Sequence, residues 1–178
     1  MHKKKIEVWE YAQQILEALP HGVLLNTKAE TLNSMVIGWG SLGIEWSKPI
    51  FTVYVREHRY SRQQLDQNGE FTISIPMGAQ DPQITKICGT CSGRDMNKID
   101  KAGLTPVESN KISVPGMAQY PLTLECRVLQ KETQDLSTLD ASCQRHYPKD
   151  VDGYHTGANQ DAHVAYIAEI VDAYVIIE

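Results

Sequence analysis

The spacing of apolar residues along the chain changes once, shortly after the N-terminus. Between about residues 5 and 19, apolar side chains recur at helical spacing until Pro20-His21-Gly22, which predicts an amphipathic helix. From residue 22 onward, short runs of β-branched and aromatic residues alternate with turn-forming residues, as in antiparallel strands. The predicted strands cover residues 22–27, 32–42, 50–55, 71–75, 122–129 and 163–177.

Three short helical patterns lie between these strands. The first covers residues 60–69, with Ser61 as its expected N-cap. The second begins after Asp81, a capping residue followed by a proline at the first helical position, and runs to Cys88. The third covers residues 97–102. The stretch Cys88-Gly-Thr-Cys91 is therefore expected at the end of a helix.

The chain length sets the number of domains. With 178 residues the protein can bury one sizeable core but hardly two. Many short strands with a few helices favour a β-barrel, because closure removes exposed strand edges. We predict one domain over residues 1–178 that is mainly β with flanking helices, with the helix at about 5–19 and the barrel at about 20–178.

Composition and charge exclude several classes of protein. A net charge of −5 argues against a broad nucleic-acid surface, because the phosphate backbone would be repelled. No apolar run approaches the roughly 20 residues that span a bilayer, and the N-terminus lacks a signal-peptide core. We expect a cytoplasmic protein without membrane or nucleic-acid partners. Four cysteines are too few for a secreted disulfide scaffold, so reduced thiols are expected.

Several motifs follow one another along the chain in a characteristic order. They are Leu19-Pro20-His21-Gly22-Val23-Leu24-Leu25, residues 32–40, Lys48-Pro49-Ile50-Phe51-Thr52-Val53, Arg56-Glu57-His58-Arg59-Tyr60-Ser61, residues 69–76, Cys88-Gly89-Thr90-Cys91-Ser92-Gly93-Arg94-Asp95 and residues 163–171. In this order they resemble the flavin reductase-like, FMN-binding split-barrel family, and most closely its flavoredoxin-type branch. The resemblance extends from about residue 16 to the C-terminus.

The resemblance implies a fold and an activity. The fold is a six-stranded antiparallel split β-barrel that forms a homodimer and binds FMN non-covalently. The activity is an oxidoreductase reaction in which electrons pass from NAD(P)H through FMN to a small molecule or a protein acceptor. Two alternatives remain: a flavoredoxin-like electron carrier without its own NAD(P)H turnover, and a flavin-free split-barrel binding module. No Gly-x-Gly-x-x-Gly fingerprint is present, so a nicotinamide would have to dock over the flavin itself.

The strand that includes residues 33–39 suits a flat, hydrogen-bonding ring. Small residues such as Ser34 and Gly38 allow close approach to the backbone, and Trp39 offers a large aromatic surface. Taken alone, the same segment also fits an ordinary barrel strand with a core tryptophan. The predicted flavin-binding residues here are Asn33, Ser34, Met35, Val36, Ile37, Gly38 and Trp39.

A second segment suits the flavin phosphate. Two guanidinium groups, a hydroxyl and the first amides of the helix near Ser61 would converge on a dianion. With the resemblance, Arg59 and Ser61 are the favoured ligands, and Arg56 and Tyr60 complete the predicted set. The alternative is a solvated turn in which Ser61 only caps its helix.

The Ser92-Gly93-Arg94-Asp95 stretch adds three more candidates. Gly93 is expected to end the preceding helix in a left-handed conformation, and Ser92 and Gly93 are predicted to contact the cofactor. The resemblance places Lys98 near the flavin, where a cation would stabilise the anionic reduced ring. Taken alone, Lys98 fits a surface lysine on a helix.

The histidines and cysteines are candidate metal ligands and redox groups. His146, His155 and His163 have no compact ligand spacing, so no metal site is expected. The resemblance places His163 near the flavin ring, where it could hydrogen-bond the cofactor or move a proton; His155 is the competing assignment. Redox Cys-x-x-Cys pairs stand at helix starts, whereas this pair is expected at a helix end. In the family that the chain resembles, the second cysteine position varies, which implies that Cys91 is incidental and Cys88 serves packing, with a reversible disulfide left open.

Overall fold

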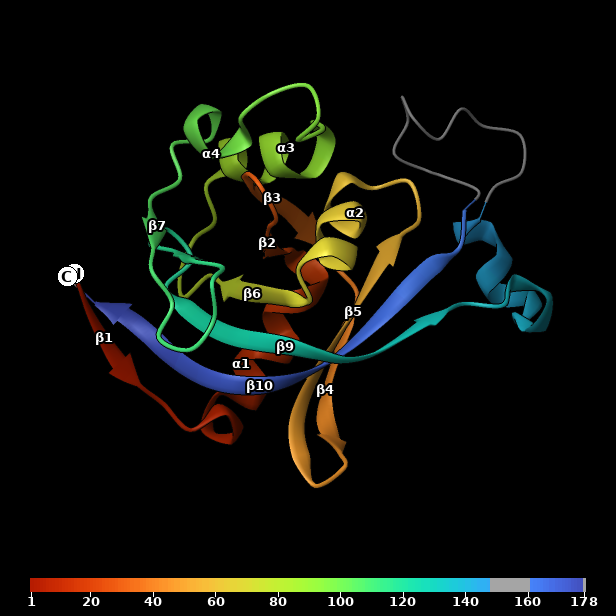
Figure 1. Cartoon of the computed structure of the whole chain (residues 1–178), viewed down its shortest axis with the longest axis horizontal. Helices are drawn as coiled ribbons and strands as arrows, with labels where there is room; N and C mark the ends of the chain where they lie inside the picture. The colour runs from red at the N-terminus through yellow and green to blue at the C-terminus, as the bar shows by residue number, and fades with distance from the viewer. Residues whose placement is uncertain (148–160, 178) are drawn as a thin grey trace.

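The computed structural model describes residues 1–147 and 161–177, and its frame is one curved antiparallel sheet (Figure 1). Its eight strands follow the order β3-β2-β6-β9-β10-β5-β4, and β1 pairs with the outer part of β10. These strands are β1 (His2–Lys5), β2 (Val23–Lys28), β3 (Leu32–Ile37), β4 (Gly40–Glu45), β5 (Lys48–Arg56), β6 (Glu70–Ile75), β9 (Leu122–Thr133) and β10 (His163–Ile177). A separate small ladder joins β7 (Pro106–Val107) and β8 (Gly116–Met117).

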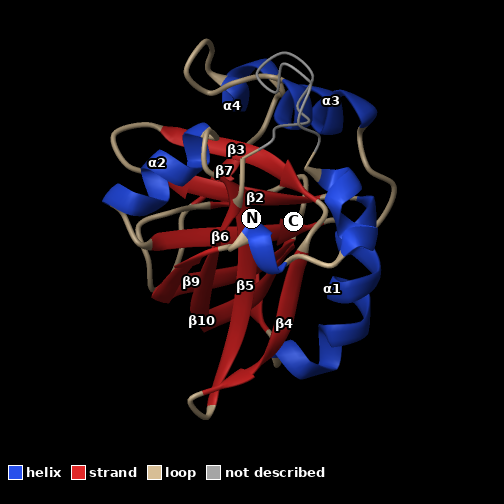
Figure 2. Ribbon diagram, turned by 90° about the vertical axis from the view of Figure 1, so that its right-hand side faces the viewer, coloured by secondary structure: helices blue, strands red, loops and turns tan. Residues whose placement is uncertain are grey.

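The two ends of the sheet order meet at a sharp corner. β3 and β4 are the terminal strands of that order, yet only Gly38 and Trp39 separate them in sequence. The sheet must therefore curl round on itself, which produces an open, split barrel (Figure 2). The predicted mainly β, antiparallel split barrel is confirmed.

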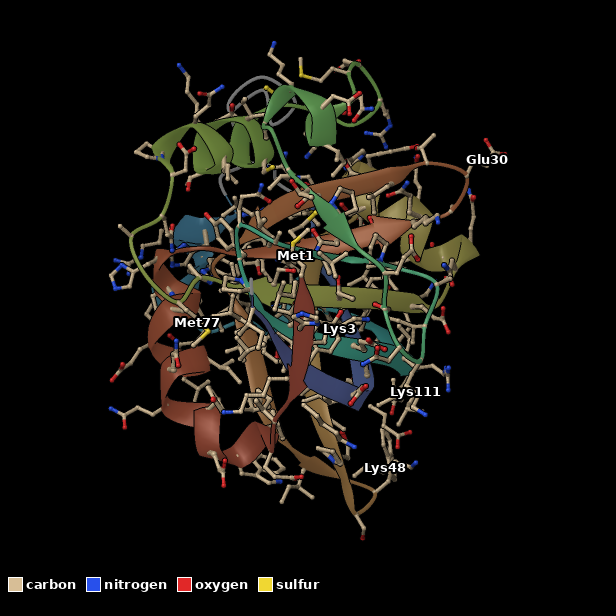
Figure 3. All side chains as sticks on the ribbon, turned by 90° about the vertical axis from the view of Figure 1, so that its left-hand side faces the viewer. Met1, Lys3, Glu30, Lys48, Met77 and Lys111 are labelled. Atoms are coloured by element: carbon tan, nitrogen blue, oxygen red, sulfur yellow. The ribbon has the colours of Figure 1, made fainter. Side chains whose placement is uncertain are left out.

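The strand count differs from the expected six for two reasons. The run predicted as one strand over residues 32–42 divides at the corner into β3 and β4. Residues 2–5 also form a strand, whose polar sequence carries no alternating apolar pattern. This strand is stabilised by contacts with distant residues. Lys3 Nζ donates to Asn110 Oδ1 at 2.7 Å and lies 5.0 Å from the Tyr174 ring centroid (Lys3 is labelled in Figure 3).

The N-terminal helix begins later than predicted. Helical structure comprises the 3-10 turn η1 (Val8–Tyr11), α1 (Ala12–Ala18) and the 3-10 turn η2 (Leu19–His21). Gly22 ends it with φ 104°, a conformation that favours glycine. The expected end at Pro20-His21-Gly22 is confirmed, whereas the expected start at residue 5 is wrong because that residue belongs to β1.

The other helices confirm one predicted cap and correct another. They are α2 (Tyr60–Gln67), α3 (Pro82–Thr90) and α4 (Lys98–Lys101). The Asp81 carboxylate accepts a hydrogen bond from the Gln83 backbone N–H at 2.7 Å and caps α3 as predicted. Ser61 is not the cap of α2, because Arg59 occupies that position and the Ser61 hydroxyl accepts from Asn33 Nδ2 at 2.9 Å.

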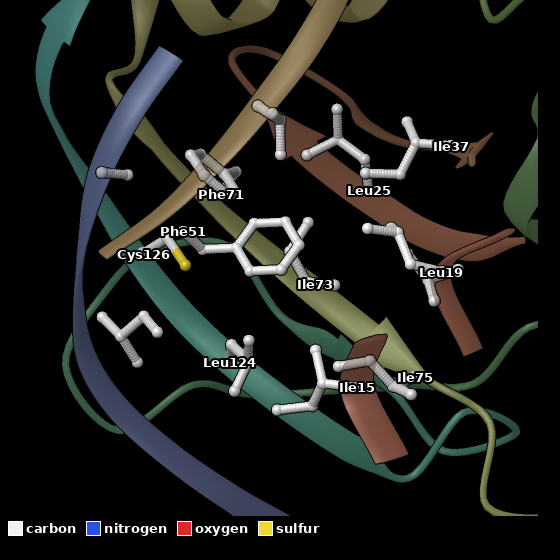
Figure 4. Packing of buried hydrophobic residues seen from close by; sticks show 14 of the residues in the cluster. Ile15, Leu19, Leu25, Ile37, Phe51, Phe71, Ile73, Ile75, Leu124 and Cys126 are labelled. Atoms are coloured by element: carbon white, nitrogen blue, oxygen red, sulfur yellow. The ribbon is translucent and has the colours of Figure 1, made fainter. Parts of the chain in front are cut away.

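The barrel interior forms the larger of two apolar clusters (Figure 4). Phe51 and Phe71 are fully buried at its centre, and Ile15 of α1 enters it from outside the sheet. Burial of such side chains contributes about 1.5–3 kcal/mol each. Ile15 therefore fixes α1 against the barrel core, while Leu16 of the same helix stays exposed.

The smaller cluster lies between the sheet and the helices over β3 (Figure 2). Leu24 packs there against Ile84 and Cys88 of α3 and Ile99 of α4. Both helices therefore pack firmly against the sheet, and residues 91–97 connect them beside β3.

β9 and β10 are the two longest strands and pair along most of their length, forming what we call the β9–β10 arm (Figure 1); β10 also pairs with β5 and β1 on its other side. β9 extends four residues beyond the predicted end at residue 129. The arm continues into η3 (Leu136–Thr138) and η4 (Ala141–His146), and the Gln134 backbone N–H donates to the His163 carbonyl at 2.9 Å. The arm therefore brings residues 134–147 next to the start of β10. Among the described residues, no helix is long and apolar enough to cross a membrane.

Candidate functional site

Three adjoining cavities form one groove along β3 and the barrel corner. The charged cavity, of about 300 Å³, lies between β3, the start of α2 and the segment 88–98. The central cavity, of about 170 Å³, shares Met35, Val36 and Arg59 with it. The uncharged cavity, of about 600 Å³, shares Trp39 and His163 with the central one. Neighbouring cavities share walls, so one extended ligand can occupy more than one of them.

The sequence predictions converge on this groove. Every predicted site residue except Ser34 lines at least one of the three cavities. Ser34 is fully buried and lines none of them. The central cavity is lined by Met35, Val36, Ile37, Gly38, Trp39, Tyr54, Arg56, Arg59 and His163.

The edge position of β3 gives the groove a backbone wall. β3 pairs with β2 on one side only, with Met35 opposite Leu25 and Val36 opposite Leu24. An edge strand presents N–H and C=O groups that no neighbouring strand uses. These groups are suited to the polar rim of a planar heterocycle.

A tight contact between three segments shapes the charged cavity. Asn33 on β3 donates to Ser61 on α2, and its own Oδ1 is buried without a hydrogen-bond partner among the described residues. A Cβ on Gly93 would overlap Asn33 and approach Tyr60 Cδ1 to 2.7 Å. Gly93 is therefore needed for space. Its predicted left-handed conformation is wrong, because only Gly22 and Gly103 among the described glycines have positive φ.

Cationic side chains surround the charged cavity. Arg59, Arg94 and Lys98 line it, together with one carboxylate, Asp95. The Arg94 guanidinium donates to the His58 carbonyl at 3.1 Å and lies 5.6 Å from the Tyr60 ring centroid. The positive excess suits an anion such as a phosphate.

Arg56 belongs to a different part of the groove. Its guanidinium donates to the carbonyl oxygens of His146 at 2.7 Å and Asp161 at 3.2 Å, and lies 5.2 Å from the Tyr147 ring centroid. It lines the central cavity but not the charged one. Arg59, in contrast, lines both the central and the charged cavity, so the two arginines face different parts of the groove.

Lys98 is a buried cation, so its interpretation as a surface lysine is wrong. It is 4 % exposed, and its Nζ donates to the Cys88 carbonyl at 3.4 Å. Burial lowers the pKa of Lys98 to about 8, with the nearby Cys88 and Cys91 opposing this shift. No ion pair within the described part of the chain neutralises it. A bound anion would supply the missing charge.

His163 and Trp39 meet where the central and uncharged cavities join. Their ring centroids are 5.0 Å apart, and Trp39 is 43 % exposed, so its interpretation as a core residue is wrong. Burial, assisted by the charge of Arg56, lowers the pKa of His163 to about 4. His163 is therefore neutral at pH 7. The competing candidate, His155, lies outside the described residues.

Two of the four cysteines, Cys88 and Cys126, are buried in the core clusters, as expected for Cys88. All four are free thiols; Cys88 is buried in the smaller core cluster, where burial raises its pKa. Cys91 lines the charged cavity. No group of side chains suited to a metal ion exists in the ranges 1–147 and 161–177.

Comparison with known proteins identifies the family. The flavin reductase-like domain model matches residues 16–177, nearly the whole chain. The chain therefore belongs to the flavin reductase-like domain family. Among curated proteins, an uncharacterized protein of Archaeoglobus fulgidus is 33 % identical over 113 residues, which cover 63 % of each chain. The chain spans only 63 % and 53 % of the length of the two curated relatives it matches.

Solved structures with the same fold support this assignment. An FMN-binding domain of a flavin reductase-like enzyme from Shewanella baltica superposes with TM-score 0.66 at 21 % identity, covering 98 % of this chain and 77 % of the other. Flavoredoxin of Desulfovibrio vulgaris gives 0.64 at 22 % identity, covering 87 % and 69 %. The NADH:FAD oxidoreductase of Streptomyces globisporus, solved with NAD and FAD fragments, gives 0.60 at 12 % identity, covering 97 % and 87 %. These likenesses establish the fold, and together with the family they support FMN as the cofactor.

Some lining residues escaped the sequence predictions. Arg94 stands inside the Ser-Gly-Arg-Asp motif, so the motif itself could have indicated it. Tyr54, Gln134 and Tyr147 carry no local signal, because they reach the groove only through strand pairing and the β9–β10 arm.

Proposed function

We propose that the groove binds FMN, with the phosphate in the charged cavity and the flavin ring along the edge of β3. One observation carries this proposal: the groove changes from cationic at one end to uncharged and aromatic at the other. FMN has the same polarity, with a dianionic phosphate at one end and a planar ring at the other. The ring would lie beside Met35, Val36 and Ile37, whose edge backbone can meet its polar rim.

The residues present fit this group in three respects. The buried Asn33 Oδ1 lacks a donor within the described residues, and the ribityl hydroxyls of FMN can supply one. Lys98 carries a buried charge that an anionic ligand would balance. Gly93 has no side chain, so Asn33 and Tyr60 can pack directly against its backbone at the wall of the charged cavity. Arg59 and the polar groups of Ser61 and Ser92 complete the proposed phosphate end.

Bound FMN would supply two-electron redox chemistry, and the residues of the chain would direct it. Lys98 places a positive charge in the groove, which favours any form of the ligand with added negative charge. Trp39 borders the approach to the ring from the uncharged side. His163, neutral at pH 7, can exchange a hydrogen bond with a ligand but adds no charge.

We propose NAD(P)H as the electron donor and a small molecule or protein as the acceptor. The Streptomyces globisporus neighbour, an NADH:FAD oxidoreductase solved with NAD, supports a donor of this class. The uncharged cavity adjoins the proposed ring position, so the nicotinamide or the acceptor has room beside it.

Steady-state oxidation of NADH and NADPH with and without FMN tests this function. Turnover that requires FMN supports the reductase. Tight FMN binding without turnover would leave the flavoredoxin-type carrier, and no FMN binding would leave a flavin-free module. The Arg59→Ala variant should lose FMN affinity while the exposed Arg145→Ala control keeps it.

We also propose that the chain forms a homodimer. Large apolar side chains are exposed in two places: Leu16 and Trp39 beside the uncharged cavity, and Ile44 and Trp46 on the β4–β5 hairpin. Monomeric proteins seldom leave such residues grouped in water. Sedimentation equilibrium tests this: a dimer mass supports it, and a monomer at tens of micromolar contradicts it.

A further inference from the structure

A chain of hydrogen bonds ends at the imidazole of His163. Tyr147 Oη lies 2.7 Å from Gln134 Oε1, and 2.9 Å from His163 Nδ1. The ring of Tyr147 stands edge-on to that of His163, with centroids 5.6 Å apart. Gln134 is itself fixed, because its backbone N–H donates to the His163 carbonyl at 2.9 Å. Three side chains brought together by the β9–β10 arm therefore act as one unit.

The direction of these bonds determines the tautomer of His163. A phenol has one proton to donate, and the carbonyl oxygen of Gln134 can only accept it. The Tyr147 oxygen must then accept a hydrogen bond from His163 Nδ1–H. In a neutral imidazole with its proton on Nδ1, Nε2 carries a lone pair and can only accept. No described residue donates a hydrogen bond to Nε2.

The cavity next to this ring has a distinct chemistry. Among the described residues that line the uncharged cavity, none is Asp, Glu, Lys or Arg. Its walls include Trp39, Tyr54 and Leu139, with His163 as a polar group shared with the central cavity. A site of this kind favours a neutral planar ligand over a charged one.

We propose that Gln134 and Tyr147 are positioning residues that hold His163 as a hydrogen-bond acceptor, and that the uncharged cavity binds a neutral aromatic compound bearing an O–H or N–H donor. This inference rests on the proposed function only in taking this compound as the redox partner of the flavin. The tautomer and the donor preference follow from the hydrogen-bond chain alone.

Nitrogen-15 NMR of His163 tests the tautomer directly, with and without added FMN at pH 8. The wild type should show a protonated Nδ1 and an unprotonated Nε2. In Gln134→Leu the Tyr147 proton is released to point at Nδ1, so the tautomer should reverse. In Gln134→Glu both carboxylate oxygens can only accept, so the wild-type tautomer should remain. A wild type with its proton on Nε2, or no reversal in Gln134→Leu, overturns the positioning role.

Binding of phenol and anisole, followed by NMR titration, tests the cavity. The two probes differ by the donor, so phenol should bind about fivefold more tightly, the size of one neutral hydrogen bond. Gln134→Leu should bring the ratio to about one by weakening phenol alone, and Gln134→Glu should preserve it. Equal affinities in the wild type, or binding of neither probe, contradict the inference.

The FMN affinity of the same samples separates this inference from the proposed function. Normal FMN binding with the wrong tautomer or no donor preference counts against the inference alone. Absent FMN binding with the expected tautomer and preference counts against the proposed function alone.

Discussion

The charged and uncharged cavities lie at opposite ends of one groove but are built in different ways. The charged cavity comes mostly from two local segments, residues 58–61 and 88–98, which carry its cations. The uncharged cavity is assembled from α1, the β3–β4 corner and the β9–β10 arm, which are far apart in sequence. The difference shows how one barrel edge can combine a cationic end, encoded in short motifs, with an uncharged end that depends on topology.

Replacing the shared arginine should have the largest effect. Arg59→Ala removes charge-assisted hydrogen bonds to the phosphate, worth about 1.5–3 kcal/mol, so FMN affinity should fall about 10- to 100-fold. Isothermal titration calorimetry measures this, with Arg145→Ala as control. Riboflavin affinity should change little, and an equal loss for both ligands would place the effect elsewhere.

The second-largest effect is expected from adding a side chain at Gly93, in the wall of the charged cavity. Gly93→Ala forces a methyl group against Asn33 and Tyr60, at a cost of about 1–3 kcal/mol. Denaturant unfolding should show lower stability, and FMN binding should weaken. The matched control is Gly78→Ala, where no atom lies within 4 Å of the new Cβ. Identical unfolding midpoints for both variants would contradict the close contact.

Acidification tests the uncharged end. The folded-state pKa of His163, about 4, lies below its ordinary value of 6.5, so the unfolded chain binds more protons between these pH values. The contribution of His163 to the free energy of unfolding is therefore present at pH 7. It falls by about 2 kcal/mol when the pH is lowered to 5. Urea unfolding at both pH values measures it. His163→Gln should lose this share of the pH dependence, and an unchanged slope would show that His163 is not buried as a neutral group.

The smallest expected effect is on FMN affinity when the pH is raised, which tests the charge of Lys98 in the charged cavity. Since the pKa of Lys98 is about 8, the free protein loses this cation as the pH passes from 7 to 9. If bound FMN requires the charge, its affinity should fall about tenfold over this range. The Lys98→Met variant should bind more weakly at pH 7 but with a flatter profile. A wild-type affinity independent of pH would remove Lys98 from the proposed site.

The sequence predicted features that local chemistry decides and missed those that depend on distant contacts. The period-two runs, the Asp81 cap and the groove residues of the short motifs follow from neighbouring residues. Ser61 fails as a cap because Asn33, 28 positions away, uses its hydroxyl. The burial of Lys98 depends on α3 and β3 packing beside α4. The curvature of the barrel divides the predicted strand at Gly38-Trp39, and no local sequence pattern indicates this curvature.

We expect the charged cavity to hold the phosphate of a flavin whose ring lies along β3. The most direct measurement compares the affinities of the wild-type protein for FMN and riboflavin, which differ only in the phosphate, by fluorescence quenching at pH 7.5. We expect FMN to bind about 100-fold more tightly than riboflavin, because two charge-assisted contacts hold its phosphate. Equal affinities for the two ligands, or binding of neither, would contradict it.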